Sequence, residues 1–270
     1  MNESAGTEMH RQTSIAGGLM TGFVCLALLL GASAGWAGGL VGRPAFCLGS
    51  DGVAMTVEFS NMCYAVQATD APSEEQGDKV QTQRGLLRAT FGVAPGMDVD
   101  IALGTANLSF PDGPAGFSTF QSEWGFAWGG GLRAGYPFQK EPWQLQLSMN
   151  YIGFRAEGET ANSQKVLRNQ YVWQELSPTL TVGYRFGQLT PFVGAMQTIL
   201  FGVRETEVEF LGAARPALGG KQNYTDAKQK PQGLMGADWR FPDGYFLTAQ
   251  VSASGQGQWG FSLGLAQALK

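Results

Sequence analysis

The chain has 270 residues, enough for one large β domain or two small ones, and only 15% of them are charged. A soluble surface normally carries about 25% charged residues, so this composition argues against an ordinary soluble protein. The formal net charge of -4 is too weak to indicate nucleic acid as a partner, and no apolar run beyond the N-terminus is long enough for a membrane helix.

The first 37 residues are predicted to be an export signal. Arg11 precedes an apolar stretch over 15–30, and two small-residue sites follow it, Ala32-Ser33-Ala34 and Gly35-Trp36-Ala37. An uncleaved anchor helix is the alternative interpretation of the same stretch. The chain is therefore divided into a signal peptide over 1–37, a periplasmic N-terminal segment over 38–52 and a β domain over 53–270.

Cleavage would leave two cysteines, Cys47 and Cys63, and an exported chain can pair them. If a straight strand begins at Val53, Cys63 lies about 33 Å along it at ~3.3 Å per residue. Pairing would then require the preceding segment to fold back beside the strand, so the sequence leaves this disulfide open.

From residue 53 onwards, apolar and polar residues alternate with the period of two that is typical of strands. In the clearest segment, 175–186, Leu176 and Leu180 lie on one face while Glu175 and Thr179 lie on the other. The alternation predicts about ten strands, within limits of eight to twelve. They are placed at 53–66, 83–94, 97–108, 123–138, 142–157, 170–186, 189–205, 231–241, 245–254 and 257–268.

The connections between these strands alternate between long and short. The long ones are 67–82, 109–122, 158–169 and 206–230, and the others are tight turns such as Pro95-Gly96 and Gly187-Gln188. Long loops on one side and short turns on the other are typical of an all-β, antiparallel up-and-down transmembrane β-barrel. An even number of strands places both termini on the short-turn side, which is periplasmic in a bacterial outer membrane.

The polar face distinguishes this barrel from a soluble one, whose outer surface would be rich in Lys and Glu. Here the polar face consists mainly of Gly, Ala, Ser, Thr, Gln and Asn, with five acids and five arginines. We expect these ten charges to form ion pairs in a confined lumen and to set the selectivity of any pore. They are Glu58, Arg84, Arg88, Asp98, Asp100, Arg133, Glu175, Arg185, Asp238 and Arg240.

Within this set, Asp98 and Asp100 point the same way on one strand. They could share a proton or bind a cation, but pairing with Arg88, Arg133, Arg185 or Arg240 is the favoured interpretation. Small residues also line the fourth strand, at Gly125, Ala127, Gly129 and Gly131. They either leave room for a narrow pore or relieve crowding, and the sequence does not separate the two.

Aromatic residues gather near both ends of the predicted strands, as lipid interfaces favour. One group is Tyr136, Phe138, Trp143, Tyr184, Phe186, Phe241 and Tyr245, and the other is Trp124, Trp173 and Trp259. On this pattern, residues 53–268 resemble the small outer-membrane β-barrel superfamily of OmpA-type, OmpW-type and opacity-type proteins. The resemblance implies a bacterial outer membrane, although the chain ends in Ala268-Leu269-Lys270 and lacks the terminal aromatic residue that such barrels usually carry.

The side chains needed for common catalytic sites are scarce. The only histidine is His10, within the predicted signal, so the mature chain would lack Ser–His and Asp–His machinery. Two cysteines alone cannot build a structural zinc site. We therefore expect no enzyme, no catalytic residues, no metal and no cofactor.

Two functions remain on the sequence alone. The first is a narrow, porin-like channel for ions or small solutes, and the alternative is a plugged structural or adhesin-like barrel that acts through its loops. The expected partners are outer-membrane lipid and an extracellular ligand at the acidic loop 67–82 or at loop 206–230, which ends in basic residues. We expect a monomer.

Overall fold

The computed structural model describes residues 48, 52–68, 78–111, 119–137, 142–161, 165–210, 218–226, 231–254 and 257–269. The predicted signal peptide over 1–37, most of the segment over 38–52 and Cys47 lie outside these residues. The signal, the segment and the Cys47–Cys63 disulfide therefore stay predictions. No helix within the described ranges is long and apolar enough to cross a membrane.

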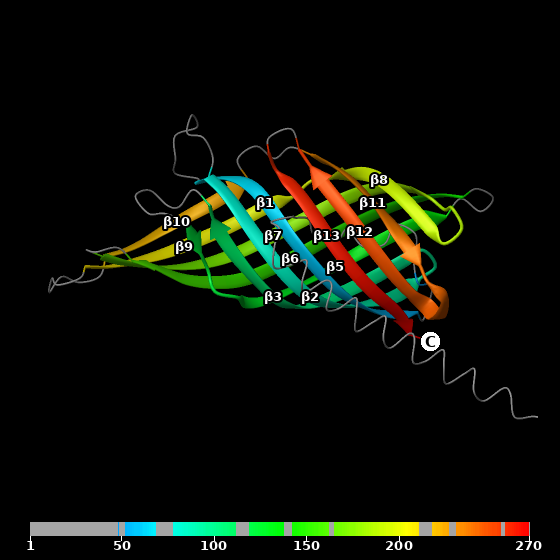
Figure 1. The fold of residues 1–270 in the computed structure, drawn as a ribbon, viewed down its shortest axis with the longest axis horizontal. Helices are drawn as coiled ribbons and strands as arrows, with labels where there is room; N and C mark the ends of the chain where they lie inside the picture. The colour runs from blue at the N-terminus through cyan, green and yellow to red at the C-terminus, as the bar shows by residue number, and fades with distance from the viewer. Residues whose placement is uncertain are drawn as a thin grey trace, which may run out of the picture. The chain divides into compact units, whose positions relative to one another are not determined.

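The described chain forms one antiparallel sheet that closes on itself, because β1 pairs with β13 (Figure 1). A single 3-10 turn, η1 (Pro242–Gly244), interrupts the strands of the described ranges. The strands are β1 (Val53–Ala68), β2 (Asp78–Ala94), β3 (Met97–Phe110), β4 (Phe120–Gln121), β5 (Gly125–Pro137), β6 (Trp143–Ala161), β7 (Lys165–Tyr184), β8 (Leu189–Met196), β9 (Ile199–Phe210), β10 (Leu218–Asp226), β11 (Gln232–Arg240), β12 (Tyr245–Ala253) and β13 (Trp259–Leu269).

These strands occupy ten positions around the barrel, because some positions hold two strands. β8 and β9 both pair with β7 and are separated only by Gln197 and Thr198. β11 pairs with β8, and β10 pairs with β9, so these two share the next position. β4 pairs with the end of β3 and precedes β5, which continues the pairing with β3. The predicted fold class, an up-and-down barrel of about ten strands, is confirmed.

The change from β8 to β9 lies opposite Pro178 of β7. Proline has no N–H to donate to a β-ladder, so it is confined to irregular positions in sheets. The Pro178 carbonyl accepts a hydrogen bond of 3.0 Å from the backbone N–H of Gln197, and the ladder of β7 continues on β9 from Leu176. The proline therefore marks where one barrel position divides into two strands.

The barrel is apolar outside and polar inside. On β6, Leu147 is 58% exposed on the outer surface, whereas the neighbouring Gln146 is 1% exposed and faces the lumen. The same reversal runs along the other strands, where large apolar side chains such as Val57, Leu132 and Leu180 are exposed. Such an exterior matches hydrocarbon and not water, and a closed barrel leaves no unpaired strand edge in lipid.

Aromatic side chains mark both edges of the apolar surface. At one edge Trp143 lies edge-on to Tyr184, with ring centroids 4.9 Å apart, and at the other Trp128 lies 5.1 Å from Tyr151. The prediction was wrong for Trp173, which is fully buried in the lumen. The reason is its parity, because Trp173 is two residues from the inward-facing Glu175 and so shares its side of β7.

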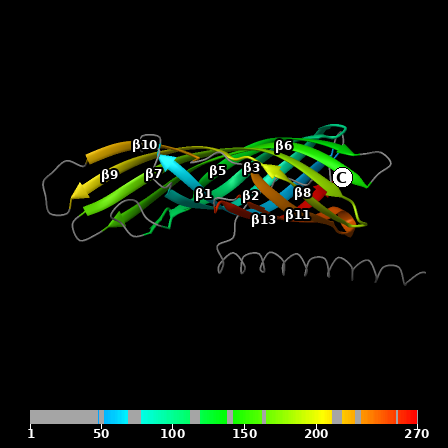
Figure 2. The same cartoon turned by 90° about the horizontal axis from the view of Figure 1, so that it is seen from above.

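The two ends of the barrel differ as the loop lengths predict. At one end the turns are tight, and φ is +80° at Gly96 and +62° at Gly187, a conformation that favours glycine. At the opposite end β6, β7, β9 and β10 extend past their neighbours (Figures 1 and 2). We call these the short-turn end and the long-loop end.

The predicted long loops over 158–169 and 206–230 are mostly strand, which corrects the sequence interpretation. β6 and β7 continue through 158–161 and 165–169, and β9 and β10 cover 206–210 and 218–226. Outward positions in this extension carry charges in place of apolar groups, so the hydrophobic alternation stops while the pairing continues. The charged, exposed residues are Arg155, Glu157, Glu159, Arg168, Glu205, Glu207, Glu209 and Lys221.

The outward position of Leu147 leads to a stability prediction. Leu147→Lys should lower the free energy of unfolding by about 2–4 kcal/mol, because a lysine near the bilayer midplane is poorly solvated. Asn223→Lys, on exposed β10 beyond the apolar surface, is the matched control and should change stability little. Urea titration of the protein refolded into lipid vesicles, followed by tryptophan fluorescence, measures both. Equal effects of the two lysines would show that Leu147 does not face lipid.

Candidate functional site in the barrel lumen

The lumen has a polar part near the short-turn end and an aromatic part near the long-loop end. Along β1, the inward residues are first Thr56, Glu58 and Ser60, and then Met62, Tyr64 and Val66. All six are at most 8% exposed. Packing therefore fills the lumen along this wall, with polar side chains nearer the short-turn end and larger, less polar ones nearer the long-loop end.

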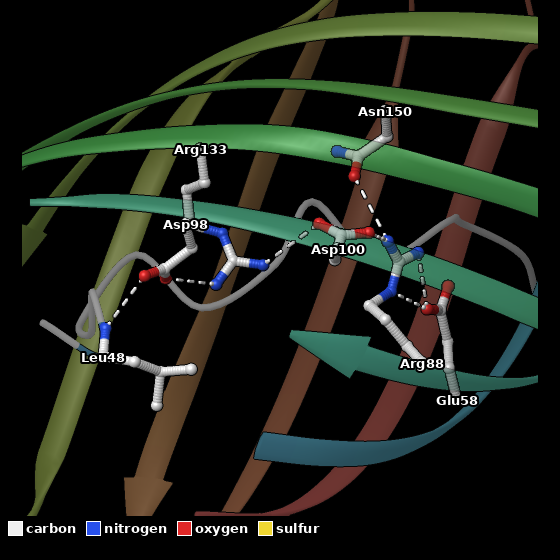
Figure 3. A network of polar contacts seen from close by, with 7 residues as sticks. All are labelled: Leu48, Glu58, Arg88, Asp98, Asp100, Arg133 and Asn150. Carbon is white, nitrogen blue, oxygen red and sulfur yellow. Dashed lines mark hydrogen bonds and ion pairs between the residues drawn. The ribbon is translucent and has the colours of Figure 1, made fainter. Parts of the chain in front are cut away.

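A chain of ion pairs, which we call the lower ion network, crosses the polar part. It consists of Glu58 on β1, Arg88 on β2, Asp98 and Asp100 on β3, and Arg133 on β5 (Figure 3). Arg88 Nη2 lies 2.9 Å from Glu58 Oε2, and Arg88 Nη1 also binds Asp100. Arg133 bridges the two aspartates at 3.5 Å from Asp98 Oδ2 and 3.8 Å from Asp100 Oδ2. This arrangement favours the ion-pair interpretation of Asp98 and Asp100.

In the lower ion network three carboxylates meet two guanidinium groups, and neutral donors and acceptors complete it. The backbone N–H of Leu48 donates to Asp98 Oδ1 at 3.0 Å, and Arg88 Nη1 donates to Asn150 Oδ1 at 3.4 Å. Leu48 comes before β1 in the sequence, and its backbone contacts the lower ion network (Figure 3). The five charged side chains are at most 5% exposed. Buried charges of this kind need these partners, because each one is costly to leave uncompensated.

A second, upper ion network pairs Arg84 on β2 with Glu175 on β7, across the lumen. Glu175 also accepts hydrogen bonds of 2.7 Å from the Tyr64 hydroxyl and from Trp173 Nε1. The Arg84 guanidinium donates to Thr82 at 2.9 Å and lies 6.0 Å from the centre of the Phe154 ring. A charge-assisted pair held by two further donors fixes opposite walls of the barrel relative to each other.

Above this pair, four rings form a group that we call the aromatic plug: Phe110, Phe120, Tyr171 and Tyr224. The centroid of Phe110 lies 5.3 Å from that of Tyr171 and 6.0 Å from that of Tyr224, and Phe120 lies 5.3 Å from Tyr171. All four are at most 4% exposed. Tilted contacts at these separations are favourable ring–ring geometry.

Three of the ten predicted lumen charges lie elsewhere or act differently. Arg185 and Arg240 are exposed at the short-turn end, which corrects the expectation that both are confined within the lumen. Arg185 follows the last residue of β7, and Arg240 lies 5.8 Å from the Phe246 ring. Asp238 is buried and accepts a hydrogen bond of 2.6 Å from the Thr248 hydroxyl. Strand parity gave the side of each residue correctly, but near a strand end that side opens to solvent.

The small residues of β5 relieve crowding. A Cβ atom at Gly131 would lie 2.5 Å from Asn150 Oδ1 and 2.9 Å from Asp100 Oδ2, both in contact with the lower ion network. At Gly129 it would lie 2.3 Å from the Tyr151 carbonyl oxygen. The structure thus supports the second of the two interpretations, in which glycine admits neighbouring groups and does not leave a pore.

Sequence reasoning missed the aromatic side of the lumen. Tyr64, Phe154 and Trp173 were not assigned to the site, although each shares strand parity with an inward charge or a neighbouring buried residue. Parity counted from Glu58 and Glu175 would have found Tyr64 and Trp173. No sequence signal marks Leu48, whose contact is made by the backbone.

No family model matches the chain, and no curated protein matches it. The solved structures provide a match to the outer-membrane protease OmpT of Escherichia coli, with a TM-score of 0.53 and 9% identity over 83% of this chain and 99% of that one. The translocator domain of the autotransporter NalP from Neisseria meningitidis is 11% identical, with a TM-score of 0.43 over 96% of this chain and 98% of that one. The OmpT likeness shows the fold, a β-barrel of the outer-membrane type, as predicted.

The expectation that the chain is not an enzyme is contradicted by the likeness to OmpT. OmpT has the same fold and is a protease, so the barrel is compatible with catalysis. A lack of histidine would exclude only catalytic mechanisms that depend on histidine, and a fold does not determine the chemistry of its sites.

The upper ion network leads to a double-mutant prediction. Arg84→Met should destabilise the barrel by about 3–5 kcal/mol, because it leaves the Glu175 carboxylate buried without its cation. Combining it with Glu175→Gln should recover most of that loss. Urea unfolding of the refolded protein measures each variant.

The exposed pair between Arg168 and Glu159 provides the control, since Arg168→Met should change stability little. If Arg84→Met is as mild as Arg168→Met, the pair of Arg84 and Glu175 does not hold the barrel together.

Proposed function

We propose that the protein is a closed outer-membrane barrel that acts through its long-loop end, in the manner of a surface-interaction protein. The observation that supports this most is the burial of the lumen charges. Arg84, Arg88 and Arg133 are at most 5% exposed, as are the carboxylates they bind. In an open, water-filled pore these side chains would line the passage and remain hydrated.

The aromatic plug supports the same proposal from the other half of the lumen. Its rings come from β3, β4, β7 and β10, so they reach inward from several walls. A solute entering from the long-loop end would have to displace these rings before it met the upper ion network. Both obstacles would have to move for ions to pass.

The extended strands give the long-loop end an ordered surface. Arg168 on β7 lies between Glu159 on β6 and Glu209 on β9, with 3.5 Å between Arg168 Nη1 and Glu209 Oε2. Lys221 on β10 lies 3.3 Å from Glu205 on β9. The hydrogen bond that Arg168 donates to Glu159 raises the pKa of Arg168, and the charges of Glu159 and Glu209 act in the same direction. A paired, charged sheet beyond the lipid is a suitable platform for a soluble partner.

A gated channel is the second candidate, and the loose position of Arg133 favours it. Its contacts of 3.5 and 3.8 Å are longer than the 2.9 Å between Arg88 and Glu58. The Ser and Gln residues of β12 and β13 also give part of the lumen a neutral polar wall. A movement of Arg133 would open the lower part, although the aromatic plug would still have to yield.

A closed lumen should not conduct ions. The refolded mature chain in a planar bilayer should give no steady current steps, because the lumen is filled by paired charges and rings. Heat-modifiable gel mobility confirms that the protein is folded. Discrete, long-lived steps from folded protein would contradict the closed barrel.

The conductance of an Arg133→Ala variant distinguishes a permanently closed lumen from a gated one. Arg133→Ala removes the most loosely held cation, and a gated barrel would then show brief openings that the unmodified chain lacks. Arg168→Ala, an exposed arginine outside the lumen, is the matched control and should stay silent. We expect silence from both variants, and openings confined to Arg133→Ala would favour the gated channel.

A further inference from the structure

The inward face of the extended sheet carries a polar cluster, which adjoins the aromatic plug and shares Tyr171 with it. It consists of Asn169 and Tyr171 on β7, Arg204 and Thr206 on β9, and Gln222 on β10, and we call it the mouth cluster. Tyr171 lies opposite Arg204, Asn169 opposite Thr206, and Gln222 opposite Arg204 in the strand registers. Cross-strand partners project to the same side of a sheet, so these five side chains face one another.

The acceptors of the mouth cluster are already in use. Gln222 Oε1 accepts a hydrogen bond from the Arg204 guanidinium and another, of 2.8 Å, from the Tyr224 hydroxyl. Asn169 Oδ1 accepts a hydrogen bond of 2.7 Å from the Thr206 hydroxyl. The amide oxygen of Gln222 therefore has both acceptor positions filled, and that of Asn169 has one filled.

The donors of the mouth cluster are in excess. Arg204 Nε and Asn169 Nδ2 are buried donors that make no hydrogen bond, and the Tyr171 hydroxyl, which lies beside Arg204, has no acceptor for its own proton. Tyr171 is fully buried and Asn169 is 3% exposed, whereas Arg204 and Gln222 are half-buried and so lie nearer the opening. Buried donors without an acceptor are unfavourable, which makes an incoming acceptor favourable.

The Arg204 guanidinium has no carboxylate in direct contact, and the charge of Asp78 acts only on its neighbours Tyr171 and Tyr224. Within the described part of the chain, no carboxylate forms an ion pair with the Arg204 guanidinium, which binds a neutral amide and lies 5.5 Å from the centre of the Tyr224 ring. Every other arginine that is buried in the lumen, at Arg84, Arg88 and Arg133, has a carboxylate within 4.0 Å. The mouth cluster thus resembles an ion-pair site from which the anion is left out.

We propose that the mouth cluster binds an oxyanion, a carboxylate or phosphate group carried by a soluble ligand. The anion pairs with Arg204 and accepts hydrogen bonds from Asn169 Nδ2 and the Tyr171 hydroxyl, and the Tyr224 ring flanks it. The site faces the axis of the barrel and not the lipid, so a free ligand reaches it more readily than a lipid headgroup. This inference rests on the proposed function, because it names what the long-loop end binds.

Calorimetric titration of the refolded chain in detergent micelles tests the site with three probes. These are inorganic phosphate, the uronic acid galacturonate, and galactose as the neutral counterpart. We expect saturable heat with at least one of the two anions and none with galactose. Repeating the titration with micelles that contain an anionic phospholipid distinguishes the sources, since competition by the lipid would show that headgroups occupy the same site.

Two variants assign the binding to the mouth cluster. Arg204→Gln should weaken the anion by roughly tenfold or more, because it removes the charge-assisted bonds. Arg168→Gln, on the opposite face of the same sheet, is the matched control and should bind like the unmodified chain. If Arg204→Gln fails to fold by gel mobility, Tyr171→Phe keeps the ring packing and should still weaken binding several-fold.

The results also separate this inference from the proposed function. Absence of heat with both anions, or equal binding by Arg204→Gln and Arg168→Gln, would overturn the oxyanion site while leaving the closed barrel intact. Steady conductance with intact anion binding would overturn the closed barrel and leave the oxyanion site standing.

Discussion

The apolar exterior and polar interior of the barrel, the reverse of a soluble protein, are the constraint on which the rest of this structure depends. In hydrocarbon every backbone N–H and C=O must find a partner within the protein, and closing the sheet between β1 and β13 satisfies this requirement without leaving an edge. Once closed, each strand must direct its apolar side chains outward and its polar ones inward. The lumen therefore receives all the charges that the membrane-spanning strands carry.

A lumen of this size cannot leave such charges separate. Ten strands enclose little more than the volume of their own side chains, so the arginines and carboxylates meet in pairs. Their positions follow: Arg88 lies between two acids, Arg133 bridges two aspartates, and Arg84 reaches across to Glu175. The glycines of β5 belong to the same arrangement, because Gly131 leaves the room that Asn150 and Asp100 occupy.

Strand number, strand parity and the difference between the two ends could all be predicted from the sequence, because lipid imposes a period of two on each spanning strand. Seven of the ten predicted lumen charges take part in ion pairs inside the barrel, for example Glu58 with Arg88. The prediction failed where the strands extend beyond the lipid, because outward side chains there need not be apolar. Beyond the lipid, β6 and β9 carry outward glutamates such as Glu159 and Glu205, and strand ends at Arg185 and Arg240 open to solvent. The stagger between strands determines which charges pair across the lumen. This stagger cannot be predicted from the alternation within one strand.

The division of two barrel positions changes the circumference along the axis. At the short-turn end the ring passes through β8, β11, β12 and β13, whereas at the long-loop end β9 pairs with β10, and β10 pairs directly with β1 at Val66, Gln67 and Ala68. The described strands thus narrow from a ring of ten to a ring of eight, in which β4 takes the fourth place. An eight-stranded ring is just wide enough for its own side chains, so four rings suffice to fill it. The barrel is therefore narrower at the long-loop end, and this eight-stranded ring would limit the size of any solute that passes.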